Sequence, residues 1–394
     1  MSKGLNKDGY SLASDSWDDL EVNAINDVIK SNRYTMGSRV LKFEKEFSNF
    51  FDVDYALMLN SGSSANLLAI GSMILDDDVD LNPGDEVIVP AVSWSTTFSP
   101  VSQYGLKLNF VDINLDTLNI DENLIENAIN EKTKAIFAVN LLGNSCNFKK
   151  LKDICNKNNL ILLEDNCESL GAKYENKYTG TIGNVGTFSF FFSHHMQTME
   201  GGMLVTNNKK TYELANSMRA HGWIRDLPDN NSLFKKTGNN FEDSFKFITP
   251  GYSIRPLEMS GAIGSVQLKK INGFIENRRK NAKFFNELFG ENEDIIIQKE
   301  VGISSWFGFS IILRNNLKNK RSEIIEKLSI ANIETRPIVA GNFTKNPTIK
   351  YMDHTISGEL KNSEYIDENG FFVGNDHRDL KTKIVLLHET LKNI

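Results

Sequence analysis

The stretch GTFSFFFSHHMQTMEGGMLVTNN, residues 186–208, carries the strongest signal for the fold. An apolar run rich in Phe leads into two adjacent histidines, His194 and His195, and a Gly-Gly pair then precedes a second apolar run. Short apolar runs bounded by glycine-rich turns are typical of strands. The sequence therefore predicts two successive strands, joined by a loop that carries two imidazoles.

Similar apolar runs precede this stretch and alternate with helical patterns such as SANLLAIGSMIL and FKKLKDICNKNN. The predicted strands cover residues 55–60, 86–91, 107–113, 135–140, 160–165, 186–192 and 202–207. Runs of this length without strict polar alternation are typical of strands buried on both faces by helices. We therefore expect an α/β fold with a mostly parallel seven-stranded sheet, to which the final pair adds a differently oriented strand.

The pattern changes near residue 255. A long helix is predicted at about residues 256–290, followed by the apolar run SWFGFSIIL, another helix and shorter pieces. The sequence thus predicts a large domain over residues 1–255, flanked by an N-terminal segment at 1–40, and a smaller α+β domain over residues 256–394.

The composition argues against several classes of protein. Of 394 residues, 40% are hydrophobic and 24% are charged, the formal net charge is −7, and no dense Lys/Arg run occurs. A nucleic-acid surface is therefore not expected. No apolar run reaches membrane-spanning length, and the N-terminus lacks the hydrophobic segment of a signal peptide. We expect a cytoplasmic protein without a nucleic-acid or membrane partner.

The three cysteines are Cys146, Cys155 and Cys167, and no two of them form a CxxC pair. An odd, low count indicates a reducing compartment and argues against a structural zinc or an iron–sulfur cluster. We therefore expect no metal site.

The segment MLNSGSSANLLAI, residues 58–70, is predicted to lead from a strand through a Ser/Gly turn into a helix. Small residues at a helix start let backbone N–H groups converge, and the helix dipole adds positive charge there. The pattern fits a phosphate site, although a simple N-cap at Ser63 or Ser64 explains it equally well.

Two further side chains follow predicted strand ends. Asp165 ends the buried strand of LILLEDNCESLGA, at the edge where open α/β sheets bind ligands. It is either a structural cap or the counter-charge to a cationic ring nitrogen. Trp94, in VPAVSWSTTF, either covers an aromatic ligand or belongs to the core.

In this order, the phosphate motif, tryptophan, aspartate and histidine loop resemble the fold-type-I pyridoxal-phosphate enzymes, specifically the DegT/DnrJ/EryC1/StrS sugar aminotransferase family. The resemblance runs from SNRYTMGSRVLKFEKEF to GFFVGN. In that family the last motif reads S-F-x-x-x-K-x-x-x-x-G-E-G-G, and its lysine forms a Schiff base with the cofactor. Counting back from Gly201 and Gly202, this position is His194, and no lysine occurs between Lys177 and Lys209.

A histidine at this position implies that the cofactor is held without a covalent bond, because imidazole cannot form a Schiff base. Imidazole can still move protons near neutral pH. The resemblance therefore implies pyridoxamine 5'-phosphate as the resting form, with pyridoxal 5'-phosphate as its partner state.

The same replacement is similar to the keto-deoxysugar 3-dehydratase branch of the family. PAVSW, NSGSSANLL, EDNCESLGA, RPLEMSGAIG, SSWFGF and ETRPIVAGNF resemble that branch as well. Some members of the branch carry an iron–sulfur cluster and need a partner reductase. Three cysteines are too few for a four-cysteine cluster, so we expect neither.

The resemblance also assigns roles to cofactor-binding residues. Asp165 would pair with the ring nitrogen and Trp94 would stack on the ring. Glu168 lies where relatives place a polar group near the ring hydroxyl. The residues expected to hold the phosphate are Gly62, Ser63 and Ser189.

The motif GYSIR has a bearing on assembly. The family usually has Asn in place of Ser253, and that Asn reaches the phosphate from the neighbouring subunit. We therefore expect a homodimer with shared active sites. For His195 a supporting role beside His194 is preferred over substrate contact. The candidates for substrate contacts are His195, His221, Arg225, Arg336 and Asn342.

Three functions follow from this resemblance. The first is 3-dehydration of a nucleotide-linked 4-keto-6-deoxy-sugar, with His194 moving the proton and glutamate restoring the cofactor amine. The second is a sugar 4-aminotransferase that lacks the usual lysine, and the third is an inactive regulatory homologue. A GDP-linked sugar is preferred by resemblance, with CDP and TDP left open.

Overall fold

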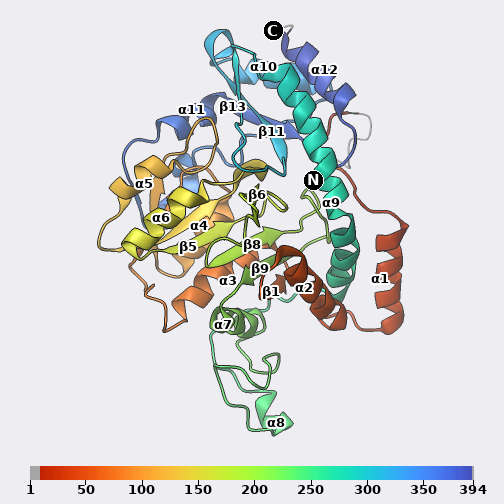
Figure 1. Cartoon of the computed structure of the whole chain (residues 1–394), viewed down its shortest axis with the longest axis vertical. Coiled ribbons are helices and arrows are strands. Elements are labelled where there is room, and N and C mark those ends of the chain that lie inside the picture. The colour runs from red at the N-terminus through yellow and green to blue at the C-terminus, as the bar shows by residue number, and fades with distance from the viewer. Residues whose placement is uncertain (1–8, 393–394) are drawn as a thin grey trace.

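The structure is a computed structural model that describes residues 9–392 (Figure 1). Within that range, the strands of the large sheet are β1 (Tyr55–Leu59), β2 (Glu86–Pro90), β3 (Lys107–Val111), β4 (Thr133–Val139), β5 (Ile161–Asp165), β8 (Val185–Ser189), β9 (Gly202–Thr206) and β12 (His354–Ile356). Their spatial order is β1-β9-β8-β5-β4-β2-β3-β12.

All seven predicted strands are present in this α/β sheet. The pairs of β8, β5, β4, β2 and β3 are parallel, whereas β9 runs antiparallel to both β1 and β8. The expectation of one differently oriented strand is therefore confirmed. The eighth strand, β12, was not predicted. It pairs in parallel with β3 and comes from the segment assigned to the smaller domain.

The helices cover both faces of the large sheet (Figure 1). The described helices are α1 (Asp19–Ser31), α2 (Ser38–Phe51), α3 (Gly62–Ile74), α4 (Ser95–Gln103), α5 (Glu122–Ala128), α6 (Phe148–Asn158), α7 (Lys209–Arg219), α8 (Asn240–Asp243), α9 (Glu258–Phe289), α10 (Arg321–Ile330), α11 (Lys361–Asn369) and α12 (Lys381–Lys392). Successive side chains of a strand point to opposite faces of the sheet. Phe137 packs in the cluster under α3, α4 and α7, whereas its neighbour Ile136 packs in the cluster under α5 and α6.

The C-terminal part holds a second, antiparallel sheet of β10 (Ile295–Ile297), β11 (Gly308–Leu313) and β13 (Gly370–Gly374). The 32-residue helix α9 links it to the large sheet. Near its start, Gly261 lets the helix meet α2, since a Cβ there would lie 2.7 Å from Cα of Val40. Near its end, Phe285 stacks on Phe309 of β11 with ring centroids 4.3 Å apart. The domain division at residue 255 remains a prediction.

Residues 221–257, between α7 and α9, form an arm that carries α8 away from the main body (Figure 1). Phe241, Phe245 and Phe247 of this arm are 81%, 67% and 54% exposed. Among residues 9–392, no helix has both the length and the apolar character needed to cross a membrane.

Candidate active site

The first turn of α3 meets the ends of β8 and β9 at close range. A Cβ on Gly62 would lie 2.6 Å from Cβ of Ser189 and 2.9 Å from Sγ of Cys167. A Cβ on Gly202 would lie 2.5 Å from the backbone N of Gly62. Both positions therefore require glycine. A helix N-terminus kept free of a side chain in this way is suited to a phosphate group.

The N-cap of α3 is Ser61, two residues before Ser63 and three before Ser64, the expected caps. Its Oγ accepts a hydrogen bond of 3.1 Å from the backbone N–H of Ser64. The expectation of an N-cap at Ser63 or Ser64 is therefore wrong: the helix is capped, but by Ser61. Oγ of Ser63 instead donates to Oγ1 of Thr96 at 2.9 Å, which ties the start of α3 to α4.

Asp165 lies at the C-terminal end of β5 and is 5% exposed. Its Oδ2 accepts hydrogen bonds from Nδ2 of Asn66 at 2.8 Å and from Oγ1 of Thr97 at 2.7 Å. Its Oδ1 accepts from the backbone N–H of Cys167 at 3.1 Å. No described cation forms a salt bridge with it. A carboxylate fixed by three neutral donors keeps its negative charge available for a cationic ligand.

Glu168 follows three residues later and is half-buried. Burial raises its pKa to about 7, and the charge of Asp165 adds to this effect, while the backbone N–H of Leu142 and the charge of Arg336 oppose it. The hydrogen bond from Leu142 N to Oε2 is 3.1 Å long. The side chain can therefore be either protonated or ionised near neutral pH.

His194 follows β8 in a turn closed by a hydrogen bond of 2.9 Å from its N–H to the carbonyl of Phe191. Burial lowers the pKa of His194 to about 3, and the charges of Arg278 and Arg336 act in the same direction. Nδ1 is buried, and no described residue offers it a hydrogen bond. The imidazole is thus neutral at physiological pH and has a ring nitrogen open to a partner.

His195 points into the protein and is 2% exposed. Its Nε2 lies 3.1 Å from the carbonyl oxygen of Ser305. The ring of Phe307 packs against both histidines, with centroid distances of 5.2 Å to His194 and 5.7 Å to His195. This burial fits the preferred supporting role of His195.

Trp94 is 56% exposed and directly precedes α4. It is therefore not a core residue. An exposed indole at the end of β2, close to Thr96 and Thr97, can cover a flat ligand.

The predicted substrate residues fall into two groups. Arg336 pairs with Phe372 through the backbone, and its charge acts on both His194 and Glu168. Asn342 is 3% exposed, and its Oδ1 accepts from the N–H and the Oγ1 of Thr344. This geometry makes Asn342 a cap, so its contact with substrate stays a prediction.

The second group lies on or beside the arm. His221 is exposed and its ring centroid is 5.1 Å from that of Trp223. The guanidinium of Arg225 lies 3.9 Å from the centroid of the Trp223 ring. Ser253 is exposed, and its Oγ accepts from Arg255 at 3.3 Å. Among the described residues, no hydrogen bond, salt bridge or ring contact joins this group to His194.

Four residues that the sequence reasoning missed complete the site. Asn66 and Thr97 fix Asp165, and a signal existed for Asn66, because it stands four residues after Gly62 on the same face of α3. Phe307 lies within SSWFGF, one of the motifs that carry the resemblance, but nothing in that motif indicates a contact with the histidines. Arg278 comes from α9 and left no local signal.

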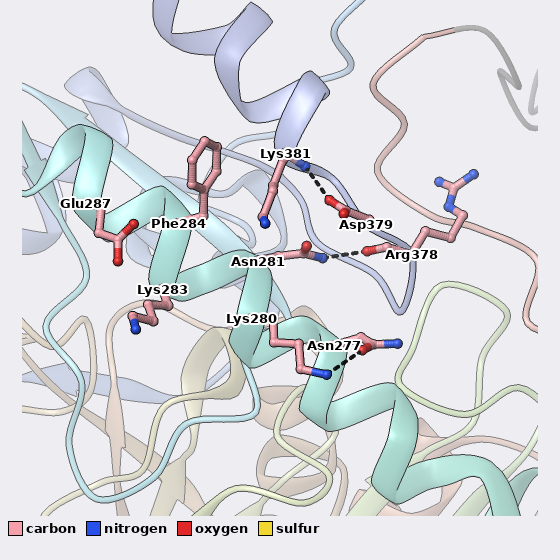
Figure 2. Close-up of a pocket in the computed structure, with 9 residues that line it drawn as sticks. All are labelled: Asn277, Lys280, Asn281, Lys283, Phe284, Glu287, Arg378, Asp379 and Lys381. Carbon is pink, nitrogen blue, oxygen red and sulfur yellow. Dashed lines mark hydrogen bonds between the residues drawn. The ribbon is translucent and has the colours of Figure 1, made fainter.

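The pocket drawn in Figure 2 lies elsewhere, between α9 and the segment before α12. It has a volume of about 400 Å³ and is lined by Asn277, Lys280, Asn281, Lys283, Phe284, Glu287, Arg378, Asp379 and Lys381. None of the predicted site residues lines it.

The fold and the strand-end site together define a protein of the fold-type-I pyridoxal-phosphate class. The chain belongs to the DegT/DnrJ/EryC1/StrS aminotransferase family, whose sequence profile matches residues 15–377. It is 52% identical over 385 residues to the GDP-4-keto-6-deoxy-D-mannose 3-dehydratase of Yersinia pseudotuberculosis, covering 97% of this chain and 98% of the relative.

Solved structures of a GDP-4-keto-6-deoxymannose 3-dehydratase are similarly close. One contains a trapped PLP–glutamate geminal diamine. It has a TM-score of 0.95 and 50% identity, covering 97% of this chain and 100% of that chain. Another has a histidine replaced by lysine and the serine directly before it replaced by asparagine. It has a TM-score of 0.94 and 49% identity, covering 96% and 100%.

Proposed function

We propose that this chain is a 3-dehydratase of GDP-4-keto-6-deoxymannose that depends on pyridoxamine phosphate, with glutamate as the amino donor. The observation that carries the proposal is His194, a half-buried imidazole with a lowered pKa and a buried, unpartnered Nδ1, which we align with the family's Schiff-base lysine. The similarity to GDP-4-keto-6-deoxy-D-mannose 3-dehydratases over nearly the full length supports the same activity.

The residues of the site fit the cofactor. Gly62 and Gly202 leave the N-terminus of α3 uncovered for a phosphate, and Ser63 and Ser189 flank it. Asp165 offers a fixed negative charge to a protonated ring nitrogen. When bound, pyridoxamine phosphate supplies an amine and a ring that withdraws electrons from the reacting carbon atoms.

His194 is assigned the proton transfer. A neutral imidazole can take a proton from carbon and afterwards return one to the departing hydroxyl group. The doubly substituted relative supports this register, because its histidine follows a serine directly. Of the six histidines in this chain, only His194 follows a serine, namely Ser193.

The remaining chain groups bind and orient. Trp94, whose indole is exposed, would cover the ring, and Glu168 would meet its hydroxyl group. Arg336 adds positive charge beside His194, where an anionic part of the amino donor or substrate would bind. Phe307 packs against His194 and helps to keep water from the imidazole.

The assembly in this proposal is a homodimer with shared active sites. The exposed aromatic residues of the arm and the exposed Trp94 support it, because such surface is normally covered by a partner. Ser253 would face the neighbouring phosphate, and His221 and Arg225 would face the substrate. The cytoplasmic location also belongs to the proposal.

The test is incubation with pyridoxamine phosphate, glutamate and GDP-4-keto-6-deoxymannose, followed by mass spectrometry of the sugar product. CDP- and TDP-linked 4-keto-6-deoxy-sugars serve as controls for the base. We expect loss of one oxygen at C3 and release of ammonia with the GDP-linked sugar. A product that keeps the C3 hydroxyl and carries nitrogen at C4 would instead identify an aminotransferase, and no product at all would favour an inactive homologue.

A further inference from the structure

Arg278 of α9 is a buried guanidinium without a carboxylate of its own. It is 4% exposed, and burial lowers its pKa to about 10, so it stays charged at neutral pH. Asp376 is the acidic group whose charge acts on it, but both oxygens of Asp376 accept hydrogen bonds from Arg378. No salt bridge among residues 9–392 includes Arg278. A buried charge of this kind is costly and calls for a specific role.

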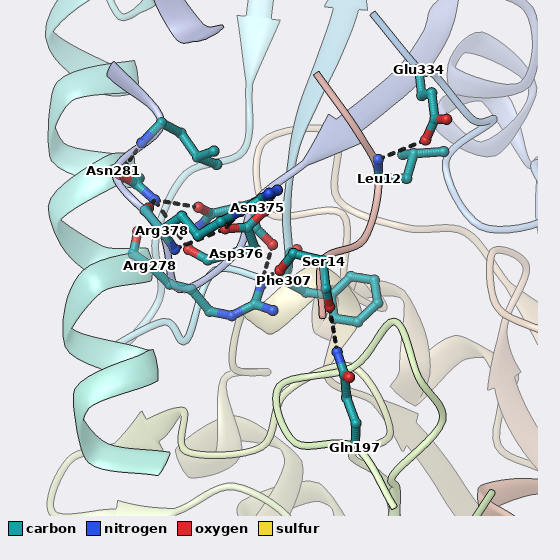
Figure 3. A network of polar contacts seen from close by, with 11 residues as sticks. Leu12, Ser14, Gln197, Arg278, Asn281, Phe307, Glu334, Asn375, Asp376 and Arg378 are labelled. Carbon is teal, nitrogen blue, oxygen red and sulfur yellow. Dashed lines mark hydrogen bonds and ion pairs between the residues drawn. The ribbon is translucent and has the colours of Figure 1, made fainter. Parts of the chain in front are cut away.

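The guanidinium binds backbone carbonyl groups (Figure 3). Nη1 lies 2.5 Å from the carbonyl oxygen of Asn375 and 3.2 Å from that of Phe307. It also lies 3.4 Å from the carbonyl oxygen of Trp306. The side chain of Asn375 donates to the Trp306 carbonyl as well, at 2.8 Å. Trp306 has a left-handed backbone, with φ of 49°, which is unusual for a bulky residue. The turn is therefore a conformation that its surroundings must hold in place.

This turn is the part of the C-terminal region that touches the two histidines. Ser305 accepts the contact from Nε2 of His195 at 3.1 Å, and Phe307 packs its ring against His194 at 67°. Movement of the turn would therefore change the surroundings of both imidazoles together.

We propose that Arg278 is a positioning residue for His194: by binding the carbonyls of Trp306, Phe307 and Asn375, it fixes the Phe307 ring against the imidazole. Arg278 does not itself contact His194. It acts through the turn and through the field of its charge, and the inference rests on the proposed proton-transfer role of His194.

The charge of Arg278 and the packing of Phe307 both favour the neutral form of His194. The charged groups that act on His194 are Arg278 from α9 and Arg336 from the loop before α11, and both lower its pKa. His195 beside it is held neutral by burial and by Arg278. Glu168 faces Arg336 from the end of β5 and is itself protonated in part near neutral pH. Arg278 thus helps to keep the imidazole of His194 ready to accept a proton.

The test is an NMR titration of the apoprotein labelled with ¹³C at histidine Cε1, from pH 8 to 4. The signal of His194 is identified by its loss in His194→Asn. In the natural protein it should not titrate in this range. Arg278→Gln keeps an N–H donor near the turn but removes the charge, so the apparent pKa of His194 should rise by about one unit or more. The acid limb of the pH profile of kcat/KM should move in the same direction.

The neighbouring Arg279 provides a matched control, because its Nε also binds a carbonyl of this segment, that of Ser304, at 2.9 Å. Its charge acts on His195 and is not among the groups that act on His194. Arg279→Gln should lower Tm but leave the His194 signal unchanged. The titration needs neither substrate nor activity, so it separates this inference from the proposed function.

Phe307→Leu serves as the second variant, since it loosens the packing on His194 and leaves Arg278 in place. It should also raise the apparent pKa of His194. The proposal is overturned if the His194 signal of a folded Arg278→Gln superimposes on that of the natural protein. It is equally overturned if Arg278→Gln does not fold and Phe307→Leu leaves the titration unchanged.

Discussion

Gly62 and Ser189 stand so close that any side chain on Gly62 would collide with Cβ of Ser189, at 2.6 Å. The contact joins the first turn of α3 to the last residue of β8, which are 127 positions apart along the chain. The proposed phosphate site therefore lies directly beside the strand that leads to His194.

Gly62→Ala should therefore weaken cofactor binding, because the added methyl group must displace Ser189 or Cys167. We expect the Kd for pyridoxal phosphate, measured by equilibrium dialysis, to rise by about tenfold or more. Gly273→Ala is the control. It lies in α9 with no atom within 4 Å of the added Cβ, and it should leave Kd unchanged. Equal affinities of the two variants would argue against a phosphate at this helix start.

Asp165→Asn should separate charge from shape. The variant keeps the size of the side chain but loses the negative charge that Asn66 and Thr97 hold in place. Turnover should fall by about 10²–10³-fold, the range seen when a key electrostatic partner is removed, and cofactor binding should weaken.

The matched control for that variant is Asp112→Asn. Asp112 is also buried at a strand end, but it follows β3, three strands along the sheet from β5, and accepts hydrogen bonds from the backbone N–H groups of Asn362 and Ser363. Its replacement should lower the free energy of unfolding without changing cofactor affinity. Near-normal turnover of Asp165→Asn would leave Asp165 with a purely structural role.

His194→Asn should bind the sugar nucleotide but stop deoxygenation, because an amide is too weak a base to accept a proton at neutral pH. His195→Asn should cost less, since Nε2 of His195 is engaged by Ser305. Product formation and substrate affinity, measured for both variants by mass spectrometry and calorimetry, distinguish the two. If only His195→Asn abolished deoxygenation, the roles of the two histidines would have to be exchanged.

The natural protein should form no covalent bond with pyridoxal phosphate at residues 178–208, where no lysine occurs. Borohydride reduction and peptide mapping should therefore find no pyridoxyl-lysine from this segment. His194→Lys should create such an adduct and absorb in the visible. A labelled lysine elsewhere in the site of the natural protein would contradict the proposed register.

Glu168 should make stability depend on pH in the apoprotein. Burial raises its folded-state pKa to about 7, from an ordinary value of 4.5. The contribution of Glu168 to the free energy of unfolding is thus fully present below pH 4.5 and is lost as pH rises through 7. Glu168→Gln should therefore gain stability relative to the natural protein between pH 5 and pH 8, measured by urea unfolding. Glu131→Gln, at an exposed position, should show no such trend.

His194 should act in the opposite direction. Its folded-state pKa is lowered to about 3, below the ordinary 6.5, so the neutral ring favours folding above pH 6.5. That contribution is lost as pH falls from 6.5 toward 3. In His194→Asn, the free energy of unfolding should fall less steeply on acidification. If the slope of this free energy against pH were the same in both proteins, the ring of His194 would take up a proton as readily in the folded as in the unfolded protein.

Seven of the eight strands of the large sheet were predictable because each is an apolar run with a turn at both ends. The role expected for His194 came from the family motif that the sequence resembles, through its spacing to Gly201 and Gly202, and it stays a prediction. β12 has only three residues, two of them half-buried, so no apolar run marked it. The left-handed turn at Trp306 and the hydrogen bonds from Arg278 to its carbonyl groups depend on tertiary contacts, which local sequence patterns do not encode.

The pairing of β12 with β3 joins residues about 245 positions apart, His354 with Leu108. During synthesis, the side of β3 that faces away from β2 therefore stays unpaired until Ile356, at about nine-tenths of the chain, has left the ribosome. Exposed edges invite pairing with other chains. Emergence of β12, and not completion of the earlier seven strands, thus ends the period in which nascent copies can aggregate through this edge.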